Sequence, residues 1–381
     1  MYILIFSRGY PSKRYKMNGI FEFDQAKALA NAGHKVIFAV VDLRSFRNIR
    51  KWGYESFRYQ NVQVEALNIP CGRVPDSIMN FLRVYAIEKL YKRIIEKYGE
   101  PNIIHSHFLK FGYSSAIVFK EKGIPLILTE HLSAMNNTSL SSELIKMGKY
   151  TYPKMDKVIA VSETLSKNIE KNFSVEVTVV PNIIDTKIFE FKENRNDTSK
   201  FNFISVGSLI PRKGMDTLIE AFRRSFIGNK NVTLTIYGDG PEKKKLKNII
   251  NKYGLCNNVF LKGSANREEI ANKMSMADCF VLASKLETFG VVYIEAMAMG
   301  LPVIATKCGG PENFVNDENG ILISVEAVDS LVTALQRMYN SRNKYNRKAI
   351  SEKIRRKFSP ENVAHLLEGL YCETIQERNN K

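Results

Sequence analysis

The stretch Ser284–Ala305 reads SKLETFGVVYIEAMAMGLPVIA, and it decides the fold prediction because it joins a loop, a helix and a strand. It carries two glutamates, Glu287 and Glu295, with seven residues between them. The apolar run Ala277–Ala283 before it has the composition of a buried strand, and Phe289–Met299 has helical length and good helix formers. A strand, a loop and a helix N-terminus are therefore predicted to meet near Glu287.

A helix N-terminus at this loop would suit an anionic ligand. Its unpaired backbone N–H groups and partial positive charge favour a diphosphate, and Gly290 allows close approach of the backbone. The two glutamates would lie roughly 12 Å apart along an ideal helix, at ~1.5 Å per residue. The catalytic carboxylates of glycosidases flank one bond at about 5–10 Å, so a glycosidase pair is disfavoured.

The whole run, from Glu-x-Phe-Gly at Glu287 to Glu-Ala-Met-Ala-x-Gly-x-Pro-Val-Ile-Ala at Glu295, resembles the donor-sugar signature of glycosyltransferase family 4. The members of this large retaining family have the GT-B fold. The resemblance covers nearly the full chain and is strongest over residues 201–323. It implies an α/β protein of GT-B architecture, with two facing doubly wound Rossmann-like domains and an interdomain cleft.

Apolar runs alternate with helical patterns along both halves of the chain. Tyr2–Phe6, Ile20–Ala32 and Val36–Val41 give a first βαβ unit. The rhythm stops at the charged stretch Glu190–Lys200, which is interpreted as a linker. The predicted parts are an acceptor-binding Rossmann-like domain at residues 1–190, a donor-binding one at 200–360, and a C-terminal helix at 361–381 that packs back on the N-terminal domain.

Phosphate-binding candidates follow the strand that opens the second half. The loop Gly207–Gly214 places Arg212 and Lys213 at the carboxyl edge of the predicted sheet, where ligands of such sheets bind. Their charges can neutralise a departing nucleoside diphosphate. Family members carry Gly-Arg at the start of this loop, whereas this chain has Ser208. Either Arg212 supplies that guanidinium, or one phosphate contact is missing.

Two residues of the first half are acceptor-side candidates by resemblance. His131 ends a predicted strand where the family has a histidine near the transferred sugar, and a neutral imidazole can hydrogen-bond a hydroxyl or help proton transfer. Gly19 ends a loop in the position of the family's acceptor loop. His105 and His107 lack a third ligand for zinc, and the chain has no Asp-x-Asp. A metal-independent enzyme without a cofactor is predicted.

The resemblance implies a retaining hexosyltransferase-type enzyme whose donor substrate is a nucleotide-diphospho-sugar. Glu287 and His131 would be catalytic, Glu295 would bind the ribose hydroxyls, and the diphosphate would be held by Arg212 and Lys213. The donor sugar and phosphates would be contacted by Glu287, Phe289, Gly290 and Val291. The expected acceptor is a glycan or a lipid-linked glycan of cell-surface polysaccharide biosynthesis. The base, the sugar, the linkage and the oligomeric state stay open.

Composition and net charge limit the possible cellular location and binding partners of the protein. The chain has 381 residues and a formal charge of +17, and both halves carry a similar excess of Lys and Arg. Such a field attracts nucleotides, anionic lipid surfaces or nucleic acid, although it equally fits a general bias toward lysine. Because Met1–Phe6 is too short for a signal-peptide core, a cytoplasmic protein is expected, peripheral on the inner face of the plasma membrane.

The role of one segment and two alternative functions remain open. The mixture of cations and aromatics in Arg44–Tyr59 is typical of a segment on an anionic membrane surface, and equally of a solvated connector. A nucleotide-sugar epimerase-like GT-B enzyme would act without a sugar acceptor. A basic nucleic-acid-binding protein would explain the charge, but the sequence shows no RNP-type or helix-turn-helix motif, and no nucleic acid partner is predicted.

Overall fold

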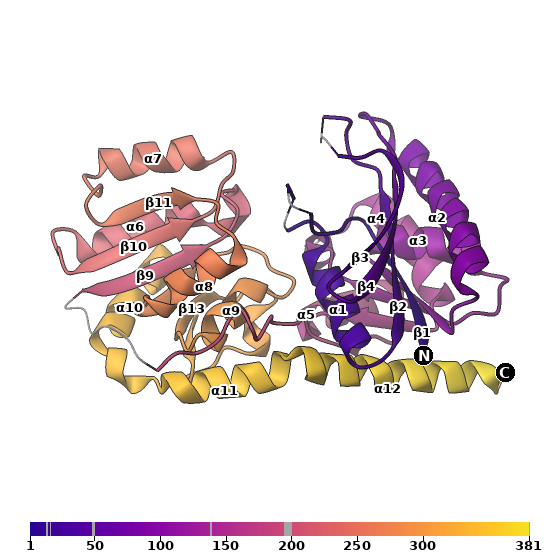
Figure 1. The fold of residues 1–381 in the computed structure, drawn as a ribbon. Helices are drawn as coiled ribbons and strands as arrows, with labels where there is room; N and C mark the ends of the chain where they lie inside the picture. The colour runs from indigo at the N-terminus through magenta and orange to yellow at the C-terminus, as the bar shows by residue number, and fades with distance from the viewer. Residues whose placement is uncertain (13, 16, 48–49, 138, 194–199, 381) are drawn as a thin grey trace. The chain divides into compact units, whose positions relative to one another are not determined.

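The computed structural model describes residues 1–12, 14–15, 17–47, 50–137, 139–193 and 200–380 (Figure 1). The chain folds into two compact units. The first joins Met1–Ile183 with the returning segment Pro360–Lys381, and the second is Ile184–Ser359. Among the described residues, no helix has both the length and the apolar content needed to cross a membrane.

The first unit is built on an eight-stranded sheet in the order β3-β4-β2-β1-β5-β6-β7-β8. Its strands are β1 Tyr2–Ser7, β2 Lys35–Asp42, β3 Gly53–Tyr59, β4 Val62–Asn68, β5 Ile103–His107, β6 Leu126–Glu130, β7 Lys157–Ala160 and β8 Thr178–Val179. Its helices are α1 Ile20–Asn31, α2 Asp76–Tyr98, α3 Leu109–Phe119, α4 Ser142–Thr151, α5 Glu163–Phe173 and α12 Pro360–Asn379. All neighbouring strands are parallel except β3 and β4. The carboxyl ends of the parallel strands therefore share one edge.

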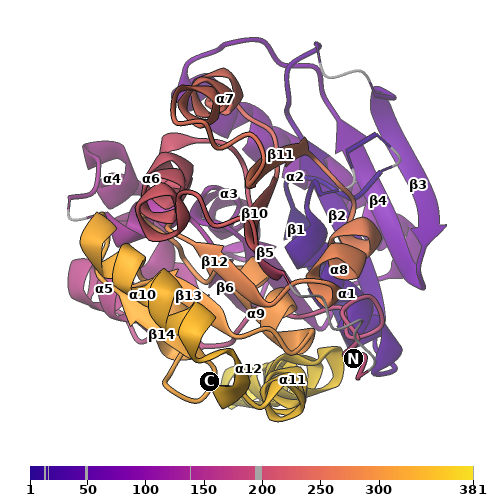
Figure 2. The ribbon, with the colours of Figure 1, turned by 90° about the vertical axis from the view of Figure 1, so that its left-hand side faces the viewer.

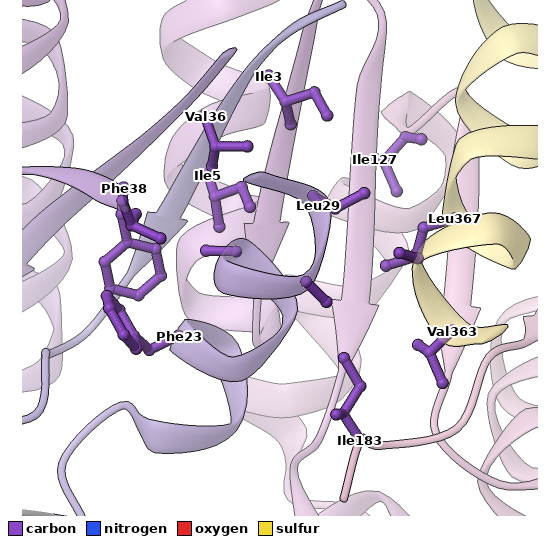
Figure 3. Close-up of a cluster of buried hydrophobic side chains, with 14 of the residues drawn as sticks. Ile3, Ile5, Phe23, Leu29, Val36, Phe38, Ile127, Ile183, Val363 and Leu367 are labelled. Atoms are coloured by element: carbon purple, nitrogen blue, oxygen red, sulfur yellow. The ribbon is translucent and has the colours of Figure 1, made fainter. Parts of the chain in front are cut away.

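The returning helix α12 completes the core of the first unit. Its residues Val363 and Leu367 are buried in a cluster with Ile127 and Ile183 (Figure 3). Polar contacts hold the same helix, because Arg378 Nη1 lies 2.7 Å from Asp156 Oδ1. A helix at the far end of the sequence is thus part of the first hydrophobic core.

The cation-rich and aromatic segment Arg44–Tyr59 includes an edge strand. Residues Gly53–Tyr59 form β3, which pairs antiparallel with β4. Arg44 and Arg50 both pair with the buried Asp42, and Arg50 lies over the Trp52 ring at 4.8 Å. The interpretation as a simple solvated connector was therefore wrong for this part, because backbone pairing and ion pairs engage it within the unit. Residues 48–49 lie outside the described part.

The second unit contains a six-stranded parallel sheet in the order β11-β10-β9-β12-β13-β14. The strands are β9 Phe201–Val206, β10 Val232–Tyr237, β11 Val259–Gly263, β12 Cys279–Leu282, β13 Val303–Thr306 and β14 Gly320–Ile323. The helices are α6 Met215–Phe226, α7 Lys243–Lys252, α8 Arg267–Ser275, α9 Val291–Ala298, α10 Val328–Asn340 and α11 Arg347–Phe358. Figure 2 shows α6 and α10 on one side of the strands and α8 and α9 on the other. This arrangement is a doubly wound sheet, as the alternation of apolar runs predicts.

The border between the two units lies earlier than the predicted linker. The units separate between Ile183 and Ile184, whereas the sequence placed the linker at Glu190–Lys200. Ile184 N–H donates to the carbonyl of Phe358 at 2.9 Å, and Arg355 Nη1 donates to the carbonyl of Phe189 at 2.7 Å. These bonds attach the segment to α11 of the second unit. Residues 194–199 of the expected linker lie outside the described part.

Two adjacent leucines on α12 test its role in the first core. Leu367 is buried, whereas Leu366 is 41% exposed. Leu367→Ala should lower the free energy of unfolding by about 2–5 kcal/mol, because it removes buried methyl groups and leaves a cavity. Leu366→Ala should change it by only about 0.5 kcal/mol. Urea unfolding measures both, and equal effects of the two substitutions would contradict this packing.

Candidate functional site

Two loops far apart in sequence meet at the carboxyl edge of the second sheet. Strands β9 and β12 are parallel neighbours, with Phe203 opposite Cys279. The loops that follow them are therefore adjacent, and Lys285 N–H donates to the carbonyl of Arg212 at 2.8 Å. Only glycine fits at residue 214, where φ is 61° and an added Cβ would lie 2.1 Å from the carbonyl oxygen of Ala283. The backbones of the two loops are thus in close contact.

An ion pair joins the same two loops. Lys213 Nζ lies 2.5 Å from Glu287 Oε1, and Ser284 Oγ donates to the same oxygen at 2.7 Å. Glu287 is buried and Lys213 is half-buried. Glu287 N–H donates to the carbonyl of Cys308 at 2.9 Å, which adds the loop after β13. The structure thus brings together two of the sequence-predicted donor residues, with charges held where solvent screens them little.

The helix after this loop begins later than predicted. Gly290 has φ 88° and precedes the first residue of α9, Val291. The Phe289 side chain is buried against the rings of Phe314 and Phe358, with centroids 5.3 Å and 5.6 Å away. Phe289 is therefore held as a core residue by the packing of its ring. The predicted helical start at Phe289 was two residues early because this ring anchors the loop.

Glu295 lies on α9 and has a partner that the sequence did not suggest. Arg267 Nη2 is 3.3 Å from Glu295 Oε1, and both side chains are about nine-tenths buried. Arg267 is the first residue of α8, after β11 of the same sheet. The position of Arg267 after a predicted strand was the only sequence signal for a site residue, because no motif includes it. The pair places a guanidinium beside the carboxylate that was predicted to bind ribose.

Arg212 and Ser208 occupy the loop after β9. Arg212 is half-buried in the short helical turn Pro211–Lys213, whereas Ser208 is exposed. The carbonyl of Arg212 accepts the bond from the neighbouring loop described above. The structure thus fixes the backbone at Arg212 next to Lys213, and it exposes a short hydroxyl side chain at Ser208, where the resemblance led us to expect an arginine.

The acceptor-side candidates of the first unit follow β1 and β6, the two strands on either side of β5. Gly19 precedes α1 with φ 65°, and an added Cβ would lie 2.1 Å from the carbonyl oxygen of Gly9. His131 follows β6, and its Nε2 lies 3.0 Å from His107 Nδ1 at the end of β5. Strands β1, β5 and β6 are parallel neighbours. Both candidates therefore belong to the carboxyl edge of the first sheet.

His131 is the last of three stacked imidazoles. The ring centroids of His105 and His107 are 4.5 Å apart, and those of His107 and His131 are 5.2 Å apart. His105 Nδ1 lies 2.6 Å from the Tyr371 hydroxyl of α12, and its Nε2 lies 2.7 Å from Thr129 Oγ1. These partners occupy both nitrogens of His105. The histidines thus form a hydrogen-bonded, packed row.

The row is held in its neutral state. Removal from solvent, followed by the charge of Arg8, lowers the pKa of His131 to about 3. Burial likewise lowers the pKa of His105 to about 3. The adjacent Glu130 carboxylate accepts hydrogen bonds from the backbone N–H groups of His131 and Leu132 at 2.9 Å and 2.8 Å. A neutral His131 can donate or accept a hydrogen bond but is not a source of positive charge at neutral pH.

Comparison with protein families accounts for both units. The model described as "Glycosyltransferase Family 4" matches residues 23–188, and the model described as "Glycosyl transferases group 1" matches residues 186–357. An uncharacterised glycosyltransferase of Methanocaldococcus jannaschii is 30% identical over 84% of this chain and 87% of its own length. The chain belongs to glycosyltransferase family 4.

Further similarities agree with this family. The GPI3 subunit of phosphatidylinositol N-acetylglucosaminyltransferase from Saccharomyces cerevisiae is 25% identical over 62% of this chain and 55% of its own length. Sucrose-phosphate synthase from Thermosynechococcus elongatus has a TM-score of 0.83 at 20% identity, with 99% of both chains covered. Anabaena HepE bound to UDP and glucose has a TM-score of 0.74 at 19% identity, covering 98% of this chain and 100% of its own. The glycosyltransferase has the GT-B fold.

Substitution of two glycines distinguishes the cost of backbone strain from the cost of a steric clash in this glycosyltransferase. Gly214 and Gly228 both have positive φ, but an added Cβ at Gly228 would meet nothing within 4 Å. Gly228→Ala should cost about 1 kcal/mol of unfolding free energy through left-handed strain. Gly214→Ala should cost about 1–3 kcal/mol more, because it also forces the two loops apart. Chemical denaturation measures the difference, and equal costs would contradict the tight loop contact.

The neutral histidines predict an unusual titration. In the unfolded chain a histidine takes a proton near about pH 6.5, but His105 and His131 resist protonation down to about pH 3. Their contribution to stability is present above about pH 6.5 and is lost as the pH falls toward 3, because only the unfolded state then binds the protons. Their ring NMR signals should stay constant between about pH 8 and 5. A titration step in that range would contradict the burial.

Proposed function

We propose that this glycosyltransferase transfers a sugar, with retention of anomeric configuration, from a nucleotide-diphospho-sugar to an acceptor. The second unit binds the donor and the first binds the acceptor. The observation that carries the proposal is the Lys213–Glu287 ion pair between the loops after β9 and β12. It supplies a preorganised cation at the sheet edge where ligands of doubly wound folds bind. The UDP and glucose bound to HepE support a donor of this class.

Each donor residue has a distinct part in the proposed reaction. The Lys213 ammonium, with Arg212, balances the charge on the leaving diphosphate. Glu287 holds Lys213 in place and contacts the transferred sugar, with Gly290 and Val291 offering backbone groups at the start of α9. Glu295, held by Arg267 at 3.3 Å, accepts hydrogen bonds from the ribose hydroxyls. Phe289 contributes through its backbone, because its ring is packed in the core.

Front-face attack is the proposed chemical route. The acceptor hydroxyl forms its bond to the anomeric carbon on the face from which the nucleoside diphosphate leaves. The acceptor proton passes to an oxygen of the departing phosphate. His131, neutral at physiological pH, hydrogen-bonds a hydroxyl of the sugar, and Gly19 keeps its loop close to the first sheet. We further propose that no metal is required, since Lys213 and Arg212 provide the positive charge.

The proposed acceptor is a lipid-linked glycan in cell-surface polysaccharide assembly at the inner face of the plasma membrane. The yeast relative supports a lipid acceptor, because its name describes an N-acetylglucosaminyltransferase of the lipid phosphatidylinositol. The charge of +17 adds support, because a basic protein is attracted to anionic bilayers. Activity that is equal with soluble and lipid-linked acceptors would contradict this part of the proposal.

Donor binding can be tested with two matched lysines. Lys213 pairs with the buried Glu287, whereas Lys353 pairs with the exposed Glu318 at 2.8 Å. Lys213→Ala should weaken nucleotide-sugar binding by about 10–100-fold, as expected for loss of one charged hydrogen bond worth about 1.5–3 kcal/mol. Lys353→Ala should leave binding unchanged. The measurement is a thermal-shift titration with UDP, GDP, ADP and their sugar conjugates, with and without EDTA.

Further variants and controls test the separate parts of this proposal. Glu295→Ala should abolish the shift by the preferred nucleotide, and Glu287→Gln should lower transfer more than donor binding. A donor shift that is lost in EDTA would contradict metal independence. Conversion of the donor sugar without acceptor would favour an epimerase-like enzyme. Absence of any donor shift in the wild type would overturn the donor assignment itself.

A further inference from the structure

Exposed apolar side chains are concentrated on the first unit. Among the described residues, all but two of the exposed large hydrophobic side chains belong to it, the two exceptions being Ile227 and Met276. The two units are of similar size, so protein size does not explain the asymmetry. Exposed apolar groups that gather on one part of a protein mark interaction surfaces.

Three of these side chains, among them the most exposed one, form a stripe on α2. Phe81 is 70% exposed, Tyr85 51% and Ile78 47%. Their spacing of three and four residues places them on one face of the helix. The opposite face is buried through Ala86, Ile87, Leu90, Tyr91 and Ile94. The helix is therefore apolar on the face that packs on the unit and also on the first turns of its outer face.

The stripe starts at the carboxyl edge of the first sheet. Helix α2 follows β4, and Lys110 at the start of α3 lies 3.3 Å from Asp76, the first residue of α2. Because α3 follows β5, which ends at His107, the start of α2 and the histidine row belong to the same edge. A bridge between Ser45 and Cys71 places a third exposed ring, Phe46, on the segment beside the chain that enters α2.

Positive charge accompanies these apolar groups. The same segments carry the basic residues Arg47, Arg73, Lys89, Lys92 and Lys110. Lys92 is paired with Glu88 at 2.8 Å and Lys110 with Asp76, and Arg47 and Arg73 are exposed. Lysines are depleted at the centres of protein interfaces, and two identical basic faces would repel each other. Apolar groups beside cations are instead the composition that binds the surface of an anionic bilayer.

We propose that Ile78, Phe81 and Tyr85 of α2, with Phe46, form a docking surface for an anionic lipid bilayer. The apolar side chains enter the boundary between headgroups and acyl chains, and the neighbouring cations meet the lipid phosphates. The inference rests on the proposed lipid-linked acceptor, since it would bring the acceptor edge of the first unit to the membrane. It assigns the surface to α2 and Phe46, and not to the whole of Arg44–Tyr59.

Vesicle co-sedimentation of the full chain tests the surface. The probes are vesicles of phosphatidylcholine alone and of phosphatidylcholine mixed with phosphatidylglycerol. The wild type should sediment with the anionic vesicles and less so at high salt. The double variant Ile78→Glu, Phe81→Glu should bind them about tenfold or more weakly, because it replaces apolar groups with anions. The matched control is Ile227→Glu on the second unit, where Ile227 is 62% exposed, and it should bind as the wild type does.

Three results would overturn the surface. They are equal vesicle binding by the double variant and the wild type, an equal loss in Ile227→Glu, and a dimer in light scattering that the double variant abolishes. Donor-induced thermal shifts of the same proteins keep the two proposals apart. A double variant that loses vesicle binding but keeps its donor shift supports the surface. A wild type that binds vesicles through α2 without any donor shift would overturn the proposed donor chemistry and leave the surface in place.

Discussion

The parallel pairing of β9 with β12 is the constraint on which the donor site depends. It sends two chain segments, separated by more than sixty residues in sequence, to the same edge of one sheet. The contact between Gly214 and Ala283 then brings the loop backbones together. Because the backbones are fixed, Lys213 and Glu287 meet without a large loss of side-chain freedom at the moment of binding. The position of the site is therefore set by the sheet topology, and the side chains of the two loops then determine its chemistry.

Charge is arranged differently at the two candidate sites. At the donor site of the second unit, lysine and arginine side chains are held against buried carboxylates, as in Lys213–Glu287 and Arg267–Glu295. At the candidate acceptor edge of the first unit, the row ending at His131 is kept neutral by burial. A diphosphate requires compensating positive charge, whereas a sugar hydroxyl requires only hydrogen-bonding partners. The contrast agrees with a division of labour between donor and acceptor binding.

Much of this fold could be predicted from local sequence, and the exceptions have physical reasons. Apolar runs mark the buried parallel strands, and Gly320–Ile323 forms β14 as expected. Strand β3 was not predicted, because an edge strand is half solvated and its cations and aromatics suggest other roles. Phe289 was predicted to lie in a helix, because the aromatic side chains that hold it in the loop lie far away in sequence. Arg267 and Tyr371 acquire their contacts only through tertiary packing, which no local spacing reveals.

Helix α12 has a consequence for the order in which the polypeptide becomes structured. The second unit is continuous in sequence, but the first is interrupted by it and needs Val363, Leu367 and Tyr371 to fill its core. During synthesis, the second unit can therefore complete its packing while the first still lacks a layer. A chain whose synthesis stops before α12 would have a complete second unit. The core of its first unit would be exposed to solvent, where chaperones could bind it.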